Sequence, residues 1–160
     1  MLPRLATPAD APELARVINL AYQVEAEMFF GERTSEDEVR DRLAAPNAAF
    51  LAIDEPGPST GRLIGAVYVE SCGLRGYFAM LSVDPAYQGR GLGKALVHAA
   101  EAHCRAAGCE VMDIDVVNLR TELPSFYASL GFTQTGTAPF ADPSRTKQPV
   151  VLLQMEKPLV

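Results

Sequence analysis

The residues with the clearest chemical potential form the segment QGRGLGK at positions 88–94, where three glycines alternate with larger residues. Residues 81–83 before it resemble the end of a strand, and an alanine-rich amphipathic pattern follows it directly. The first N–H groups of a helix lack partners within the helix and carry the positive end of its dipole. Glycines expose such amides and permit positive φ, while Arg90 and Lys94 add positive charge. The segment therefore predicts a binding site for a phosphate or pyrophosphate group.

Two common glycine loops of nucleotide-binding proteins do not fit this segment. A dinucleotide fingerprint counted from Gly89 would need glycine at position 94, where the chain has Lys94. A phosphate loop would need glycine at position 88 and Ser or Thr at position 95, where the chain has Gln88 and Ala95. A nucleotide-binding module of another class is therefore disfavoured. A glycine turn that serves structure alone stays open as the alternative for this segment by itself.

Two segments of the chain carry a family resemblance. The pattern Gln88-x-x-Gly91-x-Gly93, placed between a strand and a helix, resembles the acetyl-CoA signature of the GCN5-related N-acetyltransferases, the GNAT family. About 25 residues further on, residues 118–132 run from an Asn at a predicted strand end to Tyr127 and a closing Gly-Phe, which resembles the second signature of that family. Both signatures occur in the family's order, so the half of the chain that would bind cofactor is similar to the GNAT family.

The resemblance implies acetyl-CoA (coenzyme A) as the cofactor and gives roles to residues of both segments. The backbone at Leu81 and Val83 would pair with the pantetheine arm like an added strand, often beside a β-bulge. Asn118 would contact the same arm where two parallel strands part. Tyr127 would protonate the departing thiolate, with a core tyrosine as the alternative. The implied cofactor-binding residues are Leu81, Ser82, Val83, Gln88, Gly89, Arg90, Gly91, Leu92, Gly93, Lys94, Asn118 and Tyr127.

The implied reaction is transfer of an acetyl group from acetyl-CoA to an amine by direct attack in a ternary complex. An alkylammonium ion with a pKa of roughly 10 has to lose a proton before it can attack. The base is not identified: Glu25, Glu27 and Glu70 acting through water are candidates, and each is also readable as a solvated surface charge. Asp113 and Asp115 alternate along a predicted strand and share one face, where an edge or helix-capping role is favoured over catalysis.

The acceptor is a small-molecule or peptide amine that the sequence does not identify. Residues 24–30 place large apolar side chains beside carboxylates near a helix end, which fits an acceptor pocket or a continuation of the core. The candidate substrate contacts are Glu25, Met28, Phe29 and Glu70. A non-catalytic acyl-CoA sensor with the GNAT fold is the alternative function, since it would keep every cofactor residue.

The hydrophobic pattern predicts the elements that would position these groups. Helices are expected after Thr7, from Ser35 onward with Glu38 completing a capping box, after the glycine segment, and near residues 121–131. Strands are expected over residues 4–7, 48–53, 63–70, 77–83, 111–117, from 132 onward, and over 150–155. Short loops predict that the second to fourth strands form an antiparallel meander, whereas strand 111–117 must run parallel to strand 77–83 because a helix joins them.

These elements predict an α/β protein. The resemblance implies the GNAT fold: a mixed, mostly antiparallel central sheet of six to seven strands, flanked by about four helices, with one parallel strand pair splayed at the cofactor site. A length of 160 residues and a hydrophobic fraction of 48% suit a single N-acetyltransferase domain over residues 1–160.

Composition narrows the partners and the location. The net charge of −6 disfavours nucleic acid and anionic membrane surfaces, which attract basic patches. No apolar run approaches the roughly 18 residues of a membrane span, and the first residues lack a signal-peptide pattern. Cys72, Cys104 and Cys109 lack metal-ligand spacing and indicate reduced thiols. We therefore expect a cytoplasmic protein without a metal site, either a monomer or a homodimer.

Overall fold

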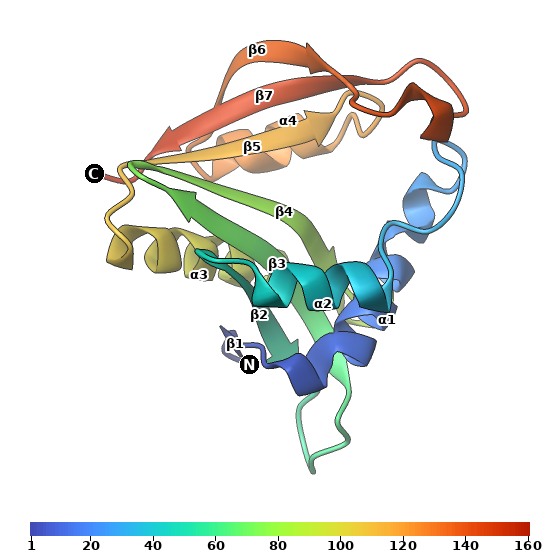
Figure 1. The fold of residues 1–160 in the computed structure, drawn as a ribbon, viewed down its shortest axis with the longest axis vertical. Coiled ribbons are helices and arrows are strands. Elements are labelled where there is room, and N and C mark those ends of the chain that lie inside the picture. The colour runs from blue at the N-terminus through green and yellow to red at the C-terminus, as the bar shows by residue number, and fades with distance from the viewer.

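A computed structural model describes all 160 residues, and its centre is one sheet of seven strands (Figure 1). The strands are β1 (Arg4–Leu5), β2 (Ala48–Asp54), β3 (Leu63–Cys72), β4 (Arg75–Val83), β5 (Val111–Val117), β6 (Thr133–Pro139) and β7 (Val151–Pro158). The helices are α1 (Ala11–Ala21), α2 (Glu36–Ala44), α3 (Leu92–Ala106) and α4 (Leu123–Ser129). The spatial order of the strands is β1-β2-β3-β4-β5-β7-β6, and only β4 and β5 are parallel. The predicted mixed sheet with about four helices is confirmed.

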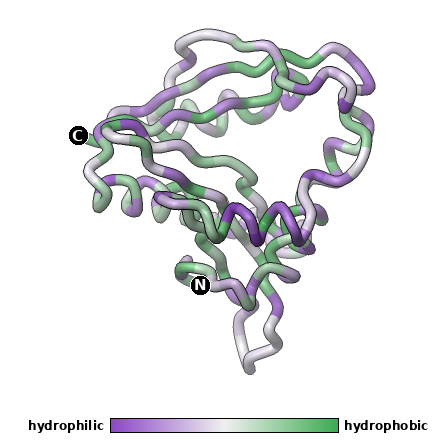
Figure 2. Tube along the Cα trace, viewed as in Figure 1, coloured by the Kyte–Doolittle hydropathy of each residue, from purple (hydrophilic) through white to green (hydrophobic).

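Helices α1 and α2 cover one face of the sheet at β2, β3 and β4 (Figure 1). Helix α1 buries one apolar stripe that includes Leu14 and Ile18. Helix α2 is mostly hydrophilic (Figure 2) and buries only Val39. The Ser35 hydroxyl accepts a hydrogen bond of 3.1 Å from the Glu38 N–H, so the predicted start of this helix is confirmed. Helices α3 and α4 pack on the opposite face, where the larger apolar cluster lies.

Strands β4 and β5 are joined at one end and separate at the other. Ladder pairs join Arg75, Gly76 and Tyr77 to residues 111–113, and none continues beyond them. Figure 1 shows the two strands diverging from that point. Strand β4 also carries a β-bulge, because Met80 and Leu81 lie where β3 offers one residue, and Met80 adopts φ of +56°. A bulky residue in the left-handed region indicates backbone strain held by its surroundings.

Two segments far apart in the sequence meet beyond the separated strand ends, and we call their contact the clasp (residues 26–32 with residues 140–147). The Phe30 N–H donates to the Arg145 carbonyl oxygen at 2.8 Å, and the Lys147 N–H donates to the Met28 carbonyl oxygen at 2.8 Å. The rings of Phe29 and Phe140 meet edge to face at 5.2 Å between centroids. The clasp therefore connects the end of the α1 region to the β6–β7 connection (Figure 1).

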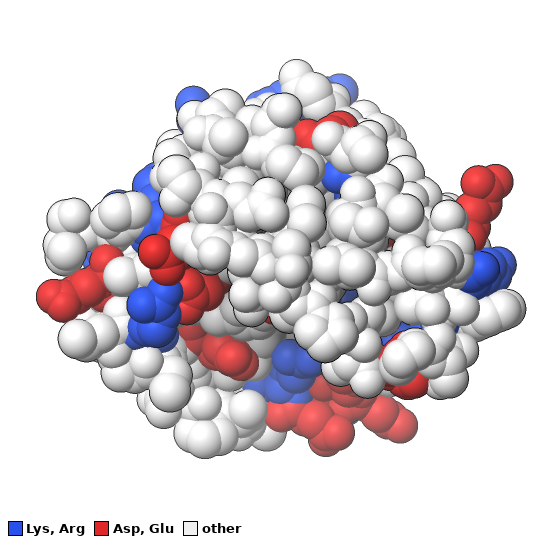
Figure 3. All heavy atoms as spheres, turned by 90° about the horizontal axis from the view of Figure 1, so that it is seen from above, with Lys and Arg blue, Asp and Glu red and all other residues white.

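The surface on the side of β6 and β7 is largely uncharged, and acidic and basic side chains mix at its edges (Figure 3). The net charge of −6 is therefore not gathered into one patch on this side. None of the helices combines the length and the apolar character that crossing a membrane requires.

Candidate functional site

The glycine turn between β4 and α3 presents open backbone. Gly89 and Gly91 both have φ of +78°, and no heavy atom lies within 4 Å of the position that a Cβ would occupy at either residue. The turn is held from below by Asp84, which is 5% exposed and accepts a 2.9 Å hydrogen bond from the Ala86 N–H. Because α3 starts at Leu92, its first N–H groups face the same concavity without helical partners. This geometry suits an anion.

A cavity of about 690 Å³, the turn cavity, lies against this segment. Its lining includes eight of the predicted cofactor residues: Leu81, Val83, Gln88, Gly89, Gly91, Leu92, Gly93 and Lys94. The other four predicted residues, Ser82, Arg90, Asn118 and Tyr127, do not line it. The Arg90 guanidinium stacks over the Tyr87 ring at 4.9 Å, and the Ser82 hydroxyl donates to the Met80 carbonyl oxygen at 2.9 Å, which holds the bulge.

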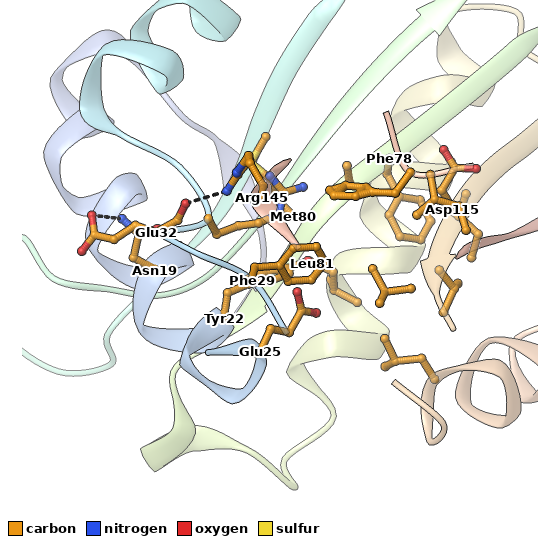
Figure 4. A pocket seen from close by; sticks show the side chains of 18 of the residues that line it. Asn19, Tyr22, Glu25, Phe29, Glu32, Phe78, Met80, Leu81, Asp115 and Arg145 are labelled. Carbon is orange, nitrogen blue, oxygen red and sulfur yellow. Dashed lines mark hydrogen bonds between the residues drawn. The ribbon is translucent and has the colours of Figure 1, made fainter. Parts of the chain in front are cut away.

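A second cavity of about 480 Å³, the strand cavity, opens between the diverging strands β4 and β5 (Figure 4). Both cavities are lined by Tyr22, Gln23 and Leu81, so they adjoin at these residues. The clasp borders the strand cavity through Phe29, Phe140 and other residues. Together the two cavities form a path from the glycine turn to the space between the strands.

Tyr127 of α4 lines the strand cavity and is also a core residue, with 7% of its surface exposed. Its ring lies 6.0 Å from that of Phe78 and 5.1 Å from that of Phe126. Burial raises the pKa of the Tyr127 hydroxyl well above its ordinary value, Tyr22 raises it further, and Arg120 opposes the shift. The hydroxyl is therefore protonated at neutral pH, as a proton donor has to be.

Asn118 follows the last residue of β5 and does not line either cavity. Its Oδ1 accepts a 2.9 Å hydrogen bond from the Val151 N–H, and its own N–H donates to the Val151 carbonyl oxygen at 3.0 Å. The side chain thus fixes the end of β5 to the start of β7. Its amide NH₂ group forms no hydrogen bond within the protein.

The predicted acidic candidates lie in different surroundings. Glu25 lines the strand cavity, but it is 8% exposed and its Oε2 lies 2.8 Å from Arg120 Nη1, so its interpretation as a solvated charge is wrong. Glu27 is exposed and lies outside both cavities. Glu70 also lies outside them, and its carboxylate accepts a 2.5 Å hydrogen bond from the Tyr68 hydroxyl. The structure therefore does not bring Glu70 to the site.

Asp113 and Asp115 share one face of β5, as predicted, but only Asp115 reaches the strand cavity. Asp113 forms a 2.7 Å ion pair with Arg75 near the joined end of the parallel strands, and neither aspartate caps a helix. Asp115 is exposed to solvent, as a solvent-facing position predicts, and the protein around part of its carboxyl, followed by the charge of Asp113, raises its pKa. Burial, followed by the charge of Asp115, raises the pKa of Tyr77 to about 12, while Arg33 lowers it. Asp115 is thus a carboxylate of the site that the sequence prediction did not select, although its alternation with Asp113 was the available signal.

Of the two predicted apolar contacts, Phe29 lines the strand cavity and Met28 does not. Arg33 and Arg145 also line this cavity, and nothing in their sequence context predicted it. Arg33 stacks over the Tyr22 ring at 5.2 Å. Arg145 Nη2 donates to the Glu32 carbonyl oxygen at 3.0 Å, which Figure 4 shows as a dashed line.

Comparisons with known proteins agree with this arrangement. Residues 17–157 match the family described as acetyltransferase (GNAT) domain. The chain is 38% identical over 101 residues to glucosamine 6-phosphate N-acetyltransferase 1 of Oryza sativa subsp. japonica, covering 59% of each chain. It is 33% identical over 144 residues to mycothiol acetyltransferase of Propionibacterium freudenreichii subsp. shermanii, covering 85% of this chain and 45% of that protein. The chain thus spans about half the length of these relatives.

A solved structure of a protein from Salmonella typhimurium, with its cofactor acetyl-CoA, has a similar fold. The TM-score is 0.75 at 22% sequence identity, covering 99% of this chain and 93% of that chain. At this identity the likeness concerns the fold.

Proposed function

Because this chain belongs to the GNAT acetyltransferase family, we propose that it binds acetyl-CoA and transfers the acetyl group directly to an amine held in the strand cavity. The observation that carries the proposal is that the turn cavity and the strand cavity adjoin at Tyr22, Gln23 and Leu81. A transferase acting through a ternary complex needs a cofactor site and an acceptor site that meet, so that amine and thioester can be aligned.

The glycine turn fits the diphosphate of coenzyme A. A side chain at Gly89 or Gly91 would project into the space at the turn, and the unpaired amides of the first turn of α3 supply donors for phosphate oxygens. Lys94 lines the same cavity and adds a positive charge. When bound, acetyl-CoA supplies an activated acyl thioester.

The separated edge of β4 suits the pantetheine arm. Beyond Tyr77 this edge has no ladder partner on β5, so its backbone groups are free to pair with an extended ligand. We propose that Leu81 and Val83 make these contacts, with Ser82 fixing the bulge through its hydroxyl. We propose that Asn118 contacts the pantetheine arm through its amide NH₂ group, which forms no hydrogen bond within the protein.

The proton transfers fall to two residues of the strand cavity. We propose that Tyr127 donates a proton to the leaving sulfur, because it lines the strand cavity and a tyrosine hydroxyl is protonated at neutral pH. Asp115 has no ion-pair partner, and its raised pKa makes it a better base than an ordinary aspartate. It replaces Glu25 as the candidate base, because the Glu25 carboxylate is held by Arg120.

We also propose that residues 1–160 act as one domain, because β1 and β7, from opposite ends of the chain, belong to one sheet. A cytoplasmic location is supported by three free thiols, which a reducing compartment preserves.

Thermal unfolding and thiol release test the proposal. A saturating concentration of acetyl-CoA, at about 100 times its Kd, should stabilise the protein by about 2.7 kcal/mol. In a chain of this length this corresponds to a rise in Tm of roughly 5–10 °C. ATP and NAD should give no rise. Incubation with acetyl-CoA and a panel of amines should then release free CoA. A rise with ATP alone would refute the cofactor assignment, and a rise with acetyl-CoA without CoA release from any amine would indicate an acyl-CoA sensor.

A further inference from the structure

The strand cavity contains two basic side chains that the protein itself leaves without a counter-charge. We propose that the acceptor is an amine that also carries an anionic oxyacid group, a carboxylate or a phosphate, and that Arg33 and Arg145 bind this group. The inference rests on the proposed function, because it describes the substrate of the same site.

Unpaired basic side chains are a minority in this protein. Nine of its 14 Lys and Arg residues form an ion pair within 4.0 Å. The five that do not are Arg33, Arg90, Lys94, Arg145 and Lys147. Arg90 and Lys94 belong to the glycine turn, where an anion is already expected. Arg33 and Arg145 line the strand cavity, so the second cavity has a pair of unpaired cations of its own.

The two guanidinium groups are held in place by contacts that leave donors free. Tyr22 is the partner of the Arg33 guanidinium, which stacks over its ring, and Arg145 uses Nη2 for the Glu32 carbonyl oxygen. The carboxylate of Glu32 does not pair with either arginine; it accepts a 3.2 Å hydrogen bond from Asn19 Nδ2 (Figure 4). A guanidinium presents several N–H donors in one plane and matches the geometry of carboxylate and phosphate groups.

Three carboxylates line the cavity, those of Glu25, Glu32 and Asp115. Glu25 pairs with Arg120, and Glu32 forms no ion pair but accepts a hydrogen bond from Asn19. Asp115 on β5 has neither an ion-pair partner nor a hydrogen-bond partner within the protein, so it is the negative charge that a bound amine can meet. Tyr77 experiences the charges of both Asp115 and Arg33, which act in opposite directions on its pKa. A ligand with an amine and an anionic group can therefore satisfy both signs of charge in this cavity.

Most of the remaining lining is apolar and limits the framework between the two groups. Phe29 and Phe140 of the clasp form one side, and Phe78 and Met80 contribute from β4. A volume of about 480 Å³ lies within the range of sites for small molecules. Amines that carry a second cation in place of the anionic group would face two unpaired guanidiniums and should be rejected.

Matched pairs of amines test the inference by calorimetry on the full chain saturated with CoA. The probes are L-phenylalanine against phenethylamine, and glucosamine 6-phosphate against glucosamine. In at least one pair the anionic member should bind roughly ten- to hundredfold more tightly, the range expected for charge-assisted hydrogen bonds. Arg33→Gln and Arg145→Gln should each remove most of this preference. Lys147→Gln removes the same charge next to the cavity without lining it and should leave the preference unchanged.

The outcomes separate the inference from the proposed function. A preference in one pair only supports the inference and identifies the oxyacid. Equal or undetectable binding of both members in both pairs overturns it, as does a preference that survives in both arginine variants. Arg145 belongs to the clasp, so Arg145→Gln could also loosen that contact. Arg33→Gln avoids this problem, because the Arg33 side chain takes part in none of the hydrogen bonds of the clasp. Acetylation of amines without any gain from an anionic group would leave the proposed function standing, whereas selective binding without acetyl transfer would refute that function and leave the binding assignment intact.

Discussion

Replacing Arg120 by methionine should destabilise the fold far more than replacing Glu25 by glutamine. The two residues form an ion pair with 2.8 Å between Nη1 and Oε2, and their side chains are 17% and 9% exposed. Arg120 has a second partner, since its Nε lies 2.6 Å from Oε1 of the exposed Glu122. Glu25 has no second cation. The two substitutions are therefore not equivalent. Removal of Arg120 leaves Glu25 without any cation, whereas removal of Glu25 leaves Arg120 paired with Glu122.

The magnitudes follow from this asymmetry. Arg120→Met leaves a buried carboxylate without a counter-charge, a change that typically costs about 3–5 kcal/mol. The partial exposure of both side chains places the expected value near the lower end, about 3 kcal/mol. In a chain of this length that is a fall in Tm of roughly 6–12 °C. Glu25→Gln leaves Arg120 paired with Glu122, and about 1 kcal/mol is expected.

Urea unfolding followed by far-UV circular dichroism at pH 7 measures both values, since the chain has no tryptophan. The double variant should be less destabilised than the sum of the single variants, because the second change removes the unpaired charge. Equal losses for the two single variants, or strict additivity in the double variant, would refute the reasoning.

Three further predictions concern the site itself. Gly91→Ala should lose about 1–2 kcal/mol of stability, because an alanine at φ of +78° is strained, and should weaken acetyl-CoA binding in calorimetry. Gly57→Ala at φ of +100° in an exposed turn should lose as much stability with no change in acetyl-CoA affinity, and equal affinities in both variants would exclude the turn as the binding site. Tyr127→Phe should lower turnover about 100-fold while sparing acetyl-CoA affinity, and unchanged turnover would remove Tyr127 from the acid role. Asp115→Asn should raise Tm at pH 7 but not at pH 3. The folded-state pKa of Asp115 lies above its unfolded value, so the ionised carboxylate destabilises the fold once the pH rises through that range. The same difference in Tm between variant and wild type at both pH values would contradict the raised pKa.

The features that the sequence predicted are those fixed by local rules. Strand β5 has the predicted bounds, Val111–Val117, because its alternating pattern and flanking turns are complete within a few residues. The parallel pairing of β4 and β5 followed from the helix between them. The glycine turn was recognisable because the need for positive φ and open amides is a property of consecutive residues.

The strand cavity was less predictable because its residues come together through long-range contacts. Glu25 was expected to be solvated, but it is buried by an arginine 95 positions away. Arg33 and Arg145 meet the cavity only because the clasp joins two segments whose sequences do not indicate a contact. Asp115 lines the cavity because β5 separates from β4 beyond Asp113. Glu70 lies on β3, on the other side of β4, and its carboxylate accepts a hydrogen bond from Tyr68. The alternation of Asp115 with Asp113 places it on one face of β5, but it does not indicate that this face lines a cavity.

The clasp also bears on how a macromolecule could be modified. Its two backbone hydrogen bonds, at Phe30 and Lys147, join residues 26–32 to residues 140–147 at the border of the strand cavity. Under the proposed function, these joined segments stand beside the bound acceptor. A lysine within another folded protein would then have to reach the cavity on its extended side chain alone. We therefore expect amines of small molecules or of chain ends to be better acceptors than internal lysines.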